Sequence, residues 1–148
     1  MIRESDAAYM AGLFDGEGSI DFTKRKEKKR SGTYNCRRVS MEISMTDQSV
    51  IRWVHEVLGV GTVVKKPRKG LRKNGTKYLM QWRWRCTFRD AYYVCRVLWP
   101  YAHTKLPKIQ QVIDHYSQEK VMEGNVVSLN QYRKACLLYT SDAADDLL

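Results

Sequence analysis

The sequence lacks several features that would assign it to a common class of protein. Its four cysteines include no Cys-x-x-Cys pair, and its three histidines have no metal-ligand spacing, so a zinc site is not expected. No apolar run approaches the roughly 18 residues of a membrane span, and the first ten residues show no signal-peptide pattern. We therefore expect a soluble, intracellular protein with reduced thiols, no membrane partner and no small-molecule cofactor.

Acidic residues are scarce where basic residues are most frequent. The formal net charge is +10, and residues 65–85 hold nine Lys or Arg and no acid. Residues 24–38 hold eight more, with Glu27 as the only acid, so the two stretches carry 17 of the 26 basic residues. Two such stretches on one folded domain suggest a phosphate backbone as the partner, although a solvated basic surface would have the same composition.

The first half of the chain predicts a helix followed by two strands. Ser5 or Asp6 can cap a helix with an apolar body at residues 7–14, and the glycines of 15–18 are expected to end it. Alternating polar and apolar residues then predict strands from Ser19 to Arg25 and over 37–46. Between them, the basic run of residues 24–32 is expected to be an exposed, mobile turn.

The second half repeats this order and adds two helices. Thr46 or Asp47 can cap a helix that ends at Gly59 and Gly61, and residues 62–67 and 78–87 are expected to form a hairpin. Helices over 90–99 and 106–116 follow. The order αββαββαα predicts an α+β fold with one four-stranded, mainly antiparallel sheet covered by helices on one face. The domain is expected to span 5–120, with a weak helix or extension at 121–140 and a non-native or disordered tail at 141–148.

Residues 10–18, MAGLFDGEG, carry the most specific signal in the chain. They match the nine-residue LAGLIDADG signature at Ala11, Gly12, Leu13, Asp15 and Gly18, with conservative changes at Met10, Phe14 and Glu17 and with Gly16 in place of Ala. The chain therefore resembles the homing endonucleases of the LAGLIDADG family that carry a single motif, over residues 5–120. The resemblance implies a homodimeric, site-specific endonuclease that cuts a long, near-palindromic double-stranded DNA target with Mg²⁺, for which Mn²⁺ can substitute.

One face of the motif helix is expected to be the dimer interface. Ala8, Ala11, Gly12 and Asp15 fall at helical spacing, and small residues let two helix backbones approach closely. The resemblance implies that the same helix of a second subunit packs there and that Asp15 caps this partner helix. The alternative is that Gly12 only makes room for a bulky neighbour within the chain.

The resemblance also implies roles for individual residues near the motif. Glu17 is expected to ligate the metal, assisted by the backbone carbonyl of Gly16, because hard divalent cations prefer oxygen ligands. Asp47 would organise solvent near the metal, although an Asp at this position is also an ordinary helix cap. Lys105 would lie beside the reacting phosphate. Lys108 and His103 are nearby residues that compete for this role.

The exposed face of the sheet is implied to lie in the DNA major groove, where side chains at alternate strand positions read base edges. Trp82 and Trp84 are expected to pack into the core instead. The residues expected to contact DNA are Ser19, Asp21, Thr23, Arg25, Arg38, Ser40, Glu42, Ser44, Lys66, Arg68, Arg83 and Arg85. For Arg83 and Arg85 the sequence leaves open which face of the last strand they lie on. Two alternatives stay open: a protein of the same fold that binds nucleic acid without cutting it, such as an intron RNA maturase or a DNA-binding regulator, and a basic nucleic-acid-binding module unrelated to the family.

Overall fold

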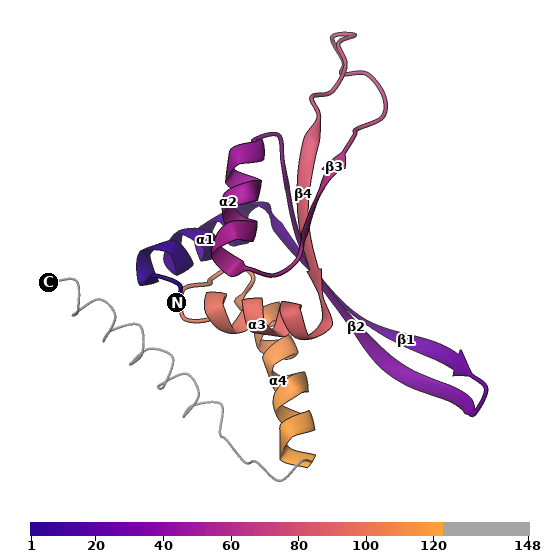
Figure 1. The fold of residues 1–148 in the computed structure, drawn as a ribbon. Coiled ribbons are helices and arrows are strands. Elements are labelled where there is room, and N and C mark those ends of the chain that lie inside the picture. Colours follow the sequence, from indigo (N-terminus) through magenta and orange to yellow (C-terminus); the bar gives the residue numbers. More distant parts are fainter. Residues whose placement is uncertain (123–148) are drawn as a thin grey trace, which may run out of the picture.

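The computed structural model describes residues 1–122, which form four helices and four strands (Figure 1). In chain order these elements are α1 (Glu4–Glu17), β1 (Gly18–Lys29), β2 (Gly32–Met45), α2 (Gln48–Leu58), β3 (Thr62–Lys66), β4 (Gln81–Thr87), α3 (Phe88–Leu98) and α4 (Leu106–Met122). The predicted order αββαββαα is confirmed. The predicted extension lies outside the described residues apart from 121 and 122, which belong to α4, and the predicted tail at 141–148 lies wholly outside them. None of the helices within residues 1–122 is long and apolar enough to cross a lipid bilayer.

The four strands form one antiparallel sheet in the order β1-β2-β4-β3, which confirms the predicted α+β architecture. The helices gather on one side of this sheet, and the β1–β2 and β3–β4 hairpins extend beyond them in different directions (Figure 1). The core lies between the sheet and the helices, where the side chains of Phe14, Met41 and Trp84 are almost completely buried. The opposite face of the sheet is left without a covering layer by residues 1–122.

Helix α1 is longer than predicted at both ends. Neither Ser5 nor Asp6 caps it, because the helix begins at Glu4 and the carboxylate of Asp6 pairs instead with the guanidinium of Arg3 at 3.2 Å. At the other end, the glycines of the motif do not interrupt the helix, which continues to Glu17. A buried stripe at helical spacing holds these turns against the core. Its members are Ala7, Met10, Ala11 and Phe14.

The basic run predicted to be a mobile turn is mostly strand. Strand β1 continues to Lys29 and pairs with β2 through Lys29↔Gly32, so the turn itself contains only residues 30 and 31. The side chains of residues 23–30 are exposed, as the charge predicted. Exposed side chains do not prevent strand pairing here, because the pairing is made by backbone hydrogen bonds between β1 and β2. Both faces of the outer half of the hairpin remain in contact with water.

Candidate functional site

Glu17 is the last residue of α1, and its carboxylate is exposed at the point where the helix gives way to β1. Among residues 1–122 this carboxylate has no hydrogen bond or ion pair. At Gly18 the chain passes from α1 into β1 against the ring of Phe14. Only glycine fits there, because a Cβ would overlap that ring. The motif therefore presents a carboxylate with all its acceptor sites open, immediately after the carbonyl group of Gly16.

The two faces of α1 differ from the predicted assignment. Ala11 has no exposed surface and packs into the core of its own chain, so the expectation that it belongs to a dimer interface is wrong for this helix orientation. Gly12 and Gly16 are exposed, and a Cβ added to either would meet no atom within 4 Å. Ala8 lies on this same exposed side. The bare face of α1 is thus formed by Ala8, Gly12 and Gly16.

Asp15 binds its own chain, contrary to the expectation that it caps a partner helix. Its two carboxylate oxygens accept hydrogen bonds from the backbone amides of His103 at 2.8 Å and Lys105 at 2.9 Å. Burial acts to raise the pKa of Asp15, but the hydrogen bonds from Lys105, His103 and Thr104 outweigh it and leave the pKa below its ordinary value. Asp15 therefore ties the end of α1 to the turn that precedes α4.

Lys105 is brought to α1 by this contact. Its backbone amide bonds Asp15, and its backbone carbonyl accepts a hydrogen bond from the amide of Ile109 at 3.0 Å, in the first turn of α4. Lys105 therefore links the end of α1 to the start of α4. Lys108 follows on the first turn of α4, and its Nζ lies 3.5 Å from the carbonyl oxygen of Ile20 on β1. His103 is exposed and contributes its backbone amide. The structure thus brings Lys105 and Lys108 close to the end of the motif.

Asp47 is a helix cap. Its Oδ1 accepts hydrogen bonds from the backbone amides of Ser49 at 3.0 Å and Val50 at 3.3 Å, and from the Ser49 hydroxyl at 2.6 Å. The Ser49 hydroxyl is the main cause of a lowered pKa, so Asp47 is a carboxylate at neutral pH. All three bonds fall on one oxygen. Within residues 1–122 no hydrogen bond joins Asp47 to Glu17 or Lys105.

Strand register places the predicted DNA-contacting residues on a common face. Ser19 lies opposite Glu42, which in turn lies opposite Arg85, and partners in an antiparallel pair point to the same side. The same register puts Trp84 on the other side, fully buried, with its Nε1 donating to the Val60 carbonyl at 2.9 Å. The face opposite the helices, here called the open face, therefore carries eleven of the twelve predicted residues. They are Ser19, Asp21, Thr23, Arg25, Arg38, Ser40, Glu42, Ser44, Lys66, Arg83 and Arg85.

Three features of the open face were not predicted. Arg68 lies beyond the end of β3, with its guanidinium 4.4 Å from the ring centre of Tyr78, so it is not part of this face. Ser40 has only 8% of its surface exposed, which leaves little of it available to a ligand. The register also adds three residues to the face: Thr62, Val64 and Gln81. Only the strand pairing identifies them, because β3, which carries Thr62 and Val64, has no clear alternation of its own, and Gln81 is placed by its pairing with Lys66.

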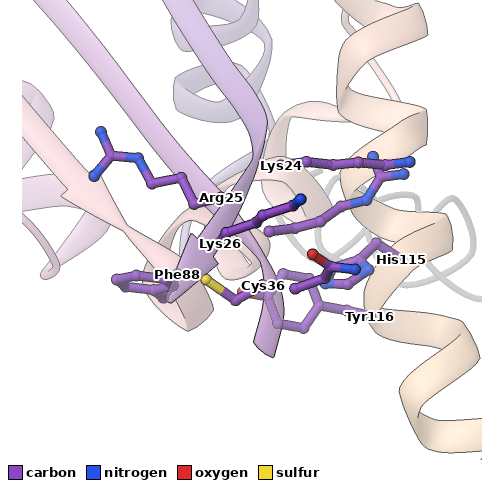
Figure 2. Close-up of a pocket in the computed structure, with 9 residues that line it drawn as sticks. Lys24, Arg25, Lys26, Cys36, Phe88, His115 and Tyr116 are labelled. Atoms are coloured by element: carbon purple, nitrogen blue, oxygen red, sulfur yellow. The ribbon is translucent and has the colours of Figure 1, made fainter. Parts of the chain in front are cut away.

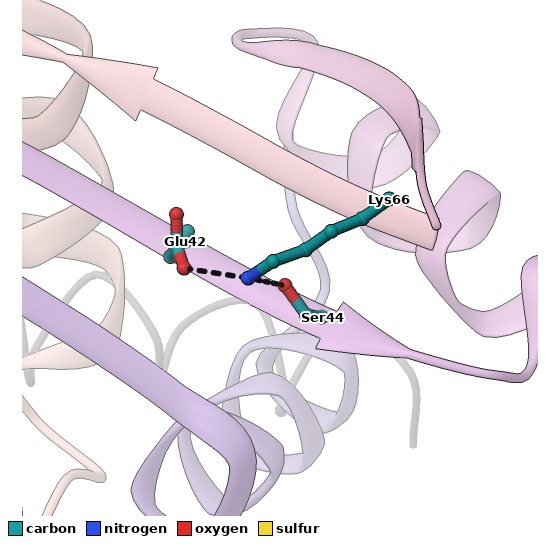
Figure 3. Close-up of polar contacts among 3 residues, drawn as sticks. All are labelled: Glu42, Ser44 and Lys66. Atoms are coloured by element: carbon teal, nitrogen blue, oxygen red, sulfur yellow. Dashed lines mark hydrogen bonds and ion pairs between the residues drawn. The ribbon is translucent and has the colours of Figure 1, made fainter. Parts of the chain in front are cut away.

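A polar contact crosses the open face from one edge strand to a central strand (Figure 3). The Nζ of Lys66 on β3 reaches past β4 to Glu42 Oε1 at 3.4 Å and Ser44 Oγ at 3.3 Å on β2. On β4, opposite Ser44 and Glu42, the Nε atoms of Arg83 and Arg85 are shielded from solvent and have no hydrogen-bond partner in the described part of the chain. The open face therefore combines polar groups held by contacts with donors that residues 1–122 do not satisfy.

Two alternative chemistries receive no support from the described residues. No three His, Cys, Asp or Glu side chains within residues 1–122 gather closely enough to hold a metal ion on their own. Burial raises the pKa of the Cys86 thiol to about 12, so it is protonated at neutral pH and is no metal-binding thiolate. His55 Nε2 lies 3.1 Å from the Gly61 carbonyl oxygen.

Comparison with known proteins agrees with this arrangement. The model of the LAGLIDADG endonuclease family matches residues 10–87, which is more than half of the chain. The fold, with its motif helix, two hairpins and open face, is that of a family of nucleases. The chain belongs to the LAGLIDADG endonuclease family. No curated relative matches it.

Solved structures of homing endonucleases share the fold at low sequence identity. The I-CvuI endonuclease, in a complex with the I-CreI target, is 18% identical with a TM-score of 0.54, and the match covers 93% of this chain and 96% of that one. The archaeal intron-encoded I-Vdi141I, complexed with DNA, is 14% identical with a TM-score of 0.55, covering 96% and 84%. I-SmaMI, bound to cleaved DNA, is 17% identical with a TM-score of 0.54, and the match covers 93% of this chain but 42% of that one.

Proposed function

We propose that the protein is a site-specific endonuclease that cuts both strands of a long, near-palindromic DNA site as a homodimer. The observation that carries this proposal is the position of Glu17: an exposed carboxylate without a partner in the described residues, at the end of the family's motif helix and beside the bare face of α1. Residues 1–122 of each chain present one such carboxylate at a motif helix, whereas a double-strand break requires attack on two phosphates. Two chains are therefore needed.

The bare face of α1 supports the homodimer. Gly12 and Gly16 each destabilise a helix by about 1 kcal/mol relative to Ala. Neither has a positive φ, and a Cβ at either position would meet open space, so the fold of the single chain does not require them. A second α1 helix packed against Ala8 and these two positions would require glycine at both, because larger side chains would force the two helices apart.

The oxygen atoms at the end of α1 fit a hard divalent cation such as Mg²⁺, with Mn²⁺ as a substitute. Glu17 would supply a carboxylate and Gly16 a carbonyl, which are the donor types such ions prefer. Two ligands from one chain suit Mg²⁺, which keeps several waters and takes phosphate oxygens from its substrate. When bound, such an ion neutralises charge on the phosphate and acidifies water. Two-fold symmetry would bring two Glu17 carboxylates together, and their repulsion favours cation binding.

Three further residues have proposed roles in hydrolysis. Lys105 would donate to the phosphate oxygen on which negative charge develops. Asp15 would act as a positioning residue, because its bonds to the amides of His103 and Lys105 hold the turn that carries this lysine. Asp47 would use Oδ2, the oxygen not engaged in capping α2, to accept a hydrogen bond from water.

The open face would bind the DNA target in its major groove. Each arginine of β4 carries a donor without a partner in the described residues, which is unfavourable until an acceptor is supplied from outside. Guanine O6 and N7 form such an acceptor pair for arginine. Glu42 and Lys66 would have to separate, at least in part, for either to contact a base.

Selection from a library of duplex DNA sites tests this proposal. The protein is incubated with the library in Mg²⁺ and, separately, in Ca²⁺, and both cut and retained sites are sequenced. We expect one near-palindromic site to be cut on both strands in Mg²⁺ and bound in Ca²⁺. Binding of a defined site without cutting in Mg²⁺ or Mn²⁺ would favour the alternative of a binding protein with the same fold.

A further inference from the structure

The β1–β2 hairpin has a free edge that the proposed DNA interface does not use. Strand β4 ends at Thr87, which lies opposite Ser40, so the part of β2 before Ser40 has no neighbour on that side within residues 1–122. A pocket of about 780 Å³ lies along this free edge, between the hairpin, the start of α3 and helix α4. It is here called the edge pocket. Its lining residues are Lys24, Arg25, Lys26, Asn35, Cys36, Arg37, Phe88, His115 and Tyr116.

The edge pocket is strongly basic. Four of its nine lining residues are Lys or Arg, and none is Asp or Glu. Lys24 and Lys26 alternate with Thr23 and Arg25, so they point to the opposite side of the sheet from the open face. All three cations are exposed, and Arg37, opposite Lys24 in the register, also stacks its guanidinium 4.7 Å from the ring centre of Phe22. These three cations would repel one another without a polyanion.

Phe88 gives the pocket an aromatic wall that the fold does not account for. It has a φ of +50° and is the single non-glycine residue with a positive φ among the described residues. For a bulky side chain this conformation is unfavourable, and glycine or asparagine would adopt it more easily. The ring is also 51% exposed, so it contributes little to the core. Such strain at an exposed aromatic residue indicates a binding role.

The shape of the pocket favours a flexible ligand. In Figure 2, Phe88 and Cys36 lie on one side of the hairpin ribbon, and Lys24, His115 and Tyr116 lie on the other. A ligand in contact with both groups must bend around the free edge of β2. Duplex DNA is stiff over about 150 base pairs, whereas a single strand bends at each nucleotide. Exposed aromatic rings beside cations are the usual means of binding unpaired bases and their phosphates.

We propose that the edge pocket binds a single-stranded segment of nucleic acid, with a base stacked on Phe88 and phosphates contacted by Lys24, Lys26 and Arg37. Arg25 lies on the open face and also lines this pocket, whereas Lys24, Lys26 and Arg37 belong to the pocket and not to the open face. Binding at this site does not depend on cleavage. RNA and single-stranded DNA share the recognised chemistry, since both offer unpaired bases on a phosphate backbone.

Binding to labelled single strands tests the edge pocket. The full-length protein is titrated, in Ca²⁺, into fluorescent RNA and DNA strands of about 12 nucleotides, and anisotropy gives Kd at several salt concentrations. The double variant K24A/K26A removes two exposed cations and should lower the slope of log Kd against log salt by about 1.4. The control K69A/K73A removes equal charge from the β3–β4 loop and should leave this binding unchanged. The strand bound more tightly identifies the ligand as RNA or DNA.

The variant Phe88→Gly separates stacking from folding. Glycine accepts the positive φ without strain, so thermal stability should be unchanged or higher. Loss of the ring should nevertheless weaken single-strand binding roughly 5- to 150-fold. The matched control Tyr93→Gly in the same helix also removes an exposed aromatic ring and should reduce stability without weakening binding.

Four results would overturn the proposal. The first is no binding of either strand, and the second is unchanged binding by K24A/K26A and F88G. The third is a polyglutamate peptide of equal length that binds as tightly, which would make the pocket a general anion or acidic-peptide site. The fourth is complete displacement of the single strand by duplex DNA, which would place the strand on the open face. Simultaneous binding of duplex and single strand supports the proposal.

Discussion

The two faces of α1 are built from the same fourteen residues but differ in what they contact. One face, formed by Ala7, Met10, Ala11 and Phe14, is buried in the core of its own chain. The other, formed by Ala8, Gly12 and Gly16, is exposed, and a Cβ added to either of its two glycines would meet no atom within 4 Å. Substitutions on the buried face should therefore change folding, whereas substitutions on the bare face should change assembly. Glu17, where the two faces end, should change neither.

The largest effect is expected from Gly12→Leu on the bare face. The new side chain has open space in the single chain and a better helix propensity, so the free energy of unfolding should stay the same or rise by up to about 1 kcal/mol. Two α1 helices in contact through bare backbone would be forced apart, so dimer and cleavage should both be lost. Light scattering and strand cleavage measure this, with Gln111→Leu on the exposed side of α4 as control. A fully active G12L dimer would remove α1 from the interface.

Phe14→Ala on the buried face should show the opposite pattern. Loss of this fully buried ring leaves a cavity beneath α1 and should lower the free energy of unfolding by about 3–5 kcal/mol. Denaturant unfolding measures the change, and Leu13→Ala, at a half-buried position one residue earlier, serves as the control with a smaller loss expected. Equal losses from the two variants would mean that the faces of α1 are not distinct.

Lys105→Met tests the link from α1 to the turn before α4. It should slow single-turnover cleavage about 100-fold while changing DNA affinity little, since the proposed contact strengthens as charge develops on the phosphate. Lys108→Met is the matched control and should cut near the wild-type rate.

Asp15→Asn should also slow cleavage, and adding it to Lys105→Met should cause little further loss, because Asp15 is proposed to act through that lysine. Fully additive losses would show that Asp15 acts elsewhere.

Arg38→Ala on the open face should have the smallest effect. It should weaken binding by about 1–3 kcal/mol and relax specificity at one base pair if its contact is bidentate. Arg30→Ala, in the hairpin turn, is the control and should leave specificity unchanged.

Wild-type affinity should fall roughly 10³- to 10⁵-fold between about 50 and 200 mM salt if 6–10 phosphates are contacted. A flat salt response would argue against the open face as the DNA surface.

Helical spacing predicted the motif helix but not the direction in which it faces. Ala8, Ala11, Gly12 and Asp15 do lie at helical intervals, yet Ala11 is buried and Asp15 binds the turn at His103. Small residues occur on both faces of α1, so residue size alone could not decide which face packs inside. The turn at 103–105 is nearly ninety residues away in sequence, and only the tertiary fold brings it to Asp15.

For the strands too, the sequence predicted part of the structure, whereas strand limits and the facing of side chains had to come from the fold. Charge correctly predicted that residues 24–30 are exposed, but it could not show that the backbone continues as strand to Lys29. In β4, tryptophans and arginines alternate and both are large, so the sequence left the facing of Arg83 and Arg85 undecided. Pairing with Ser44 and Glu42 decides it. Local pattern thus predicted the elements and the motif, whereas register and long-range contacts required the structure.

The most direct test of the account is the cleavage rate of Glu17→Gln on the selected DNA site. The substitution keeps the size of the side chain and removes the charge that is proposed to ligate the metal. We predict that the variant remains a dimer, binds the site in Ca²⁺ with nearly wild-type affinity, and no longer cuts either strand in Mg²⁺. Glu4→Gln, at the opposite end of α1, is the control and should cut normally. Cleavage by Glu17→Gln at a near-wild-type rate would contradict the central claim.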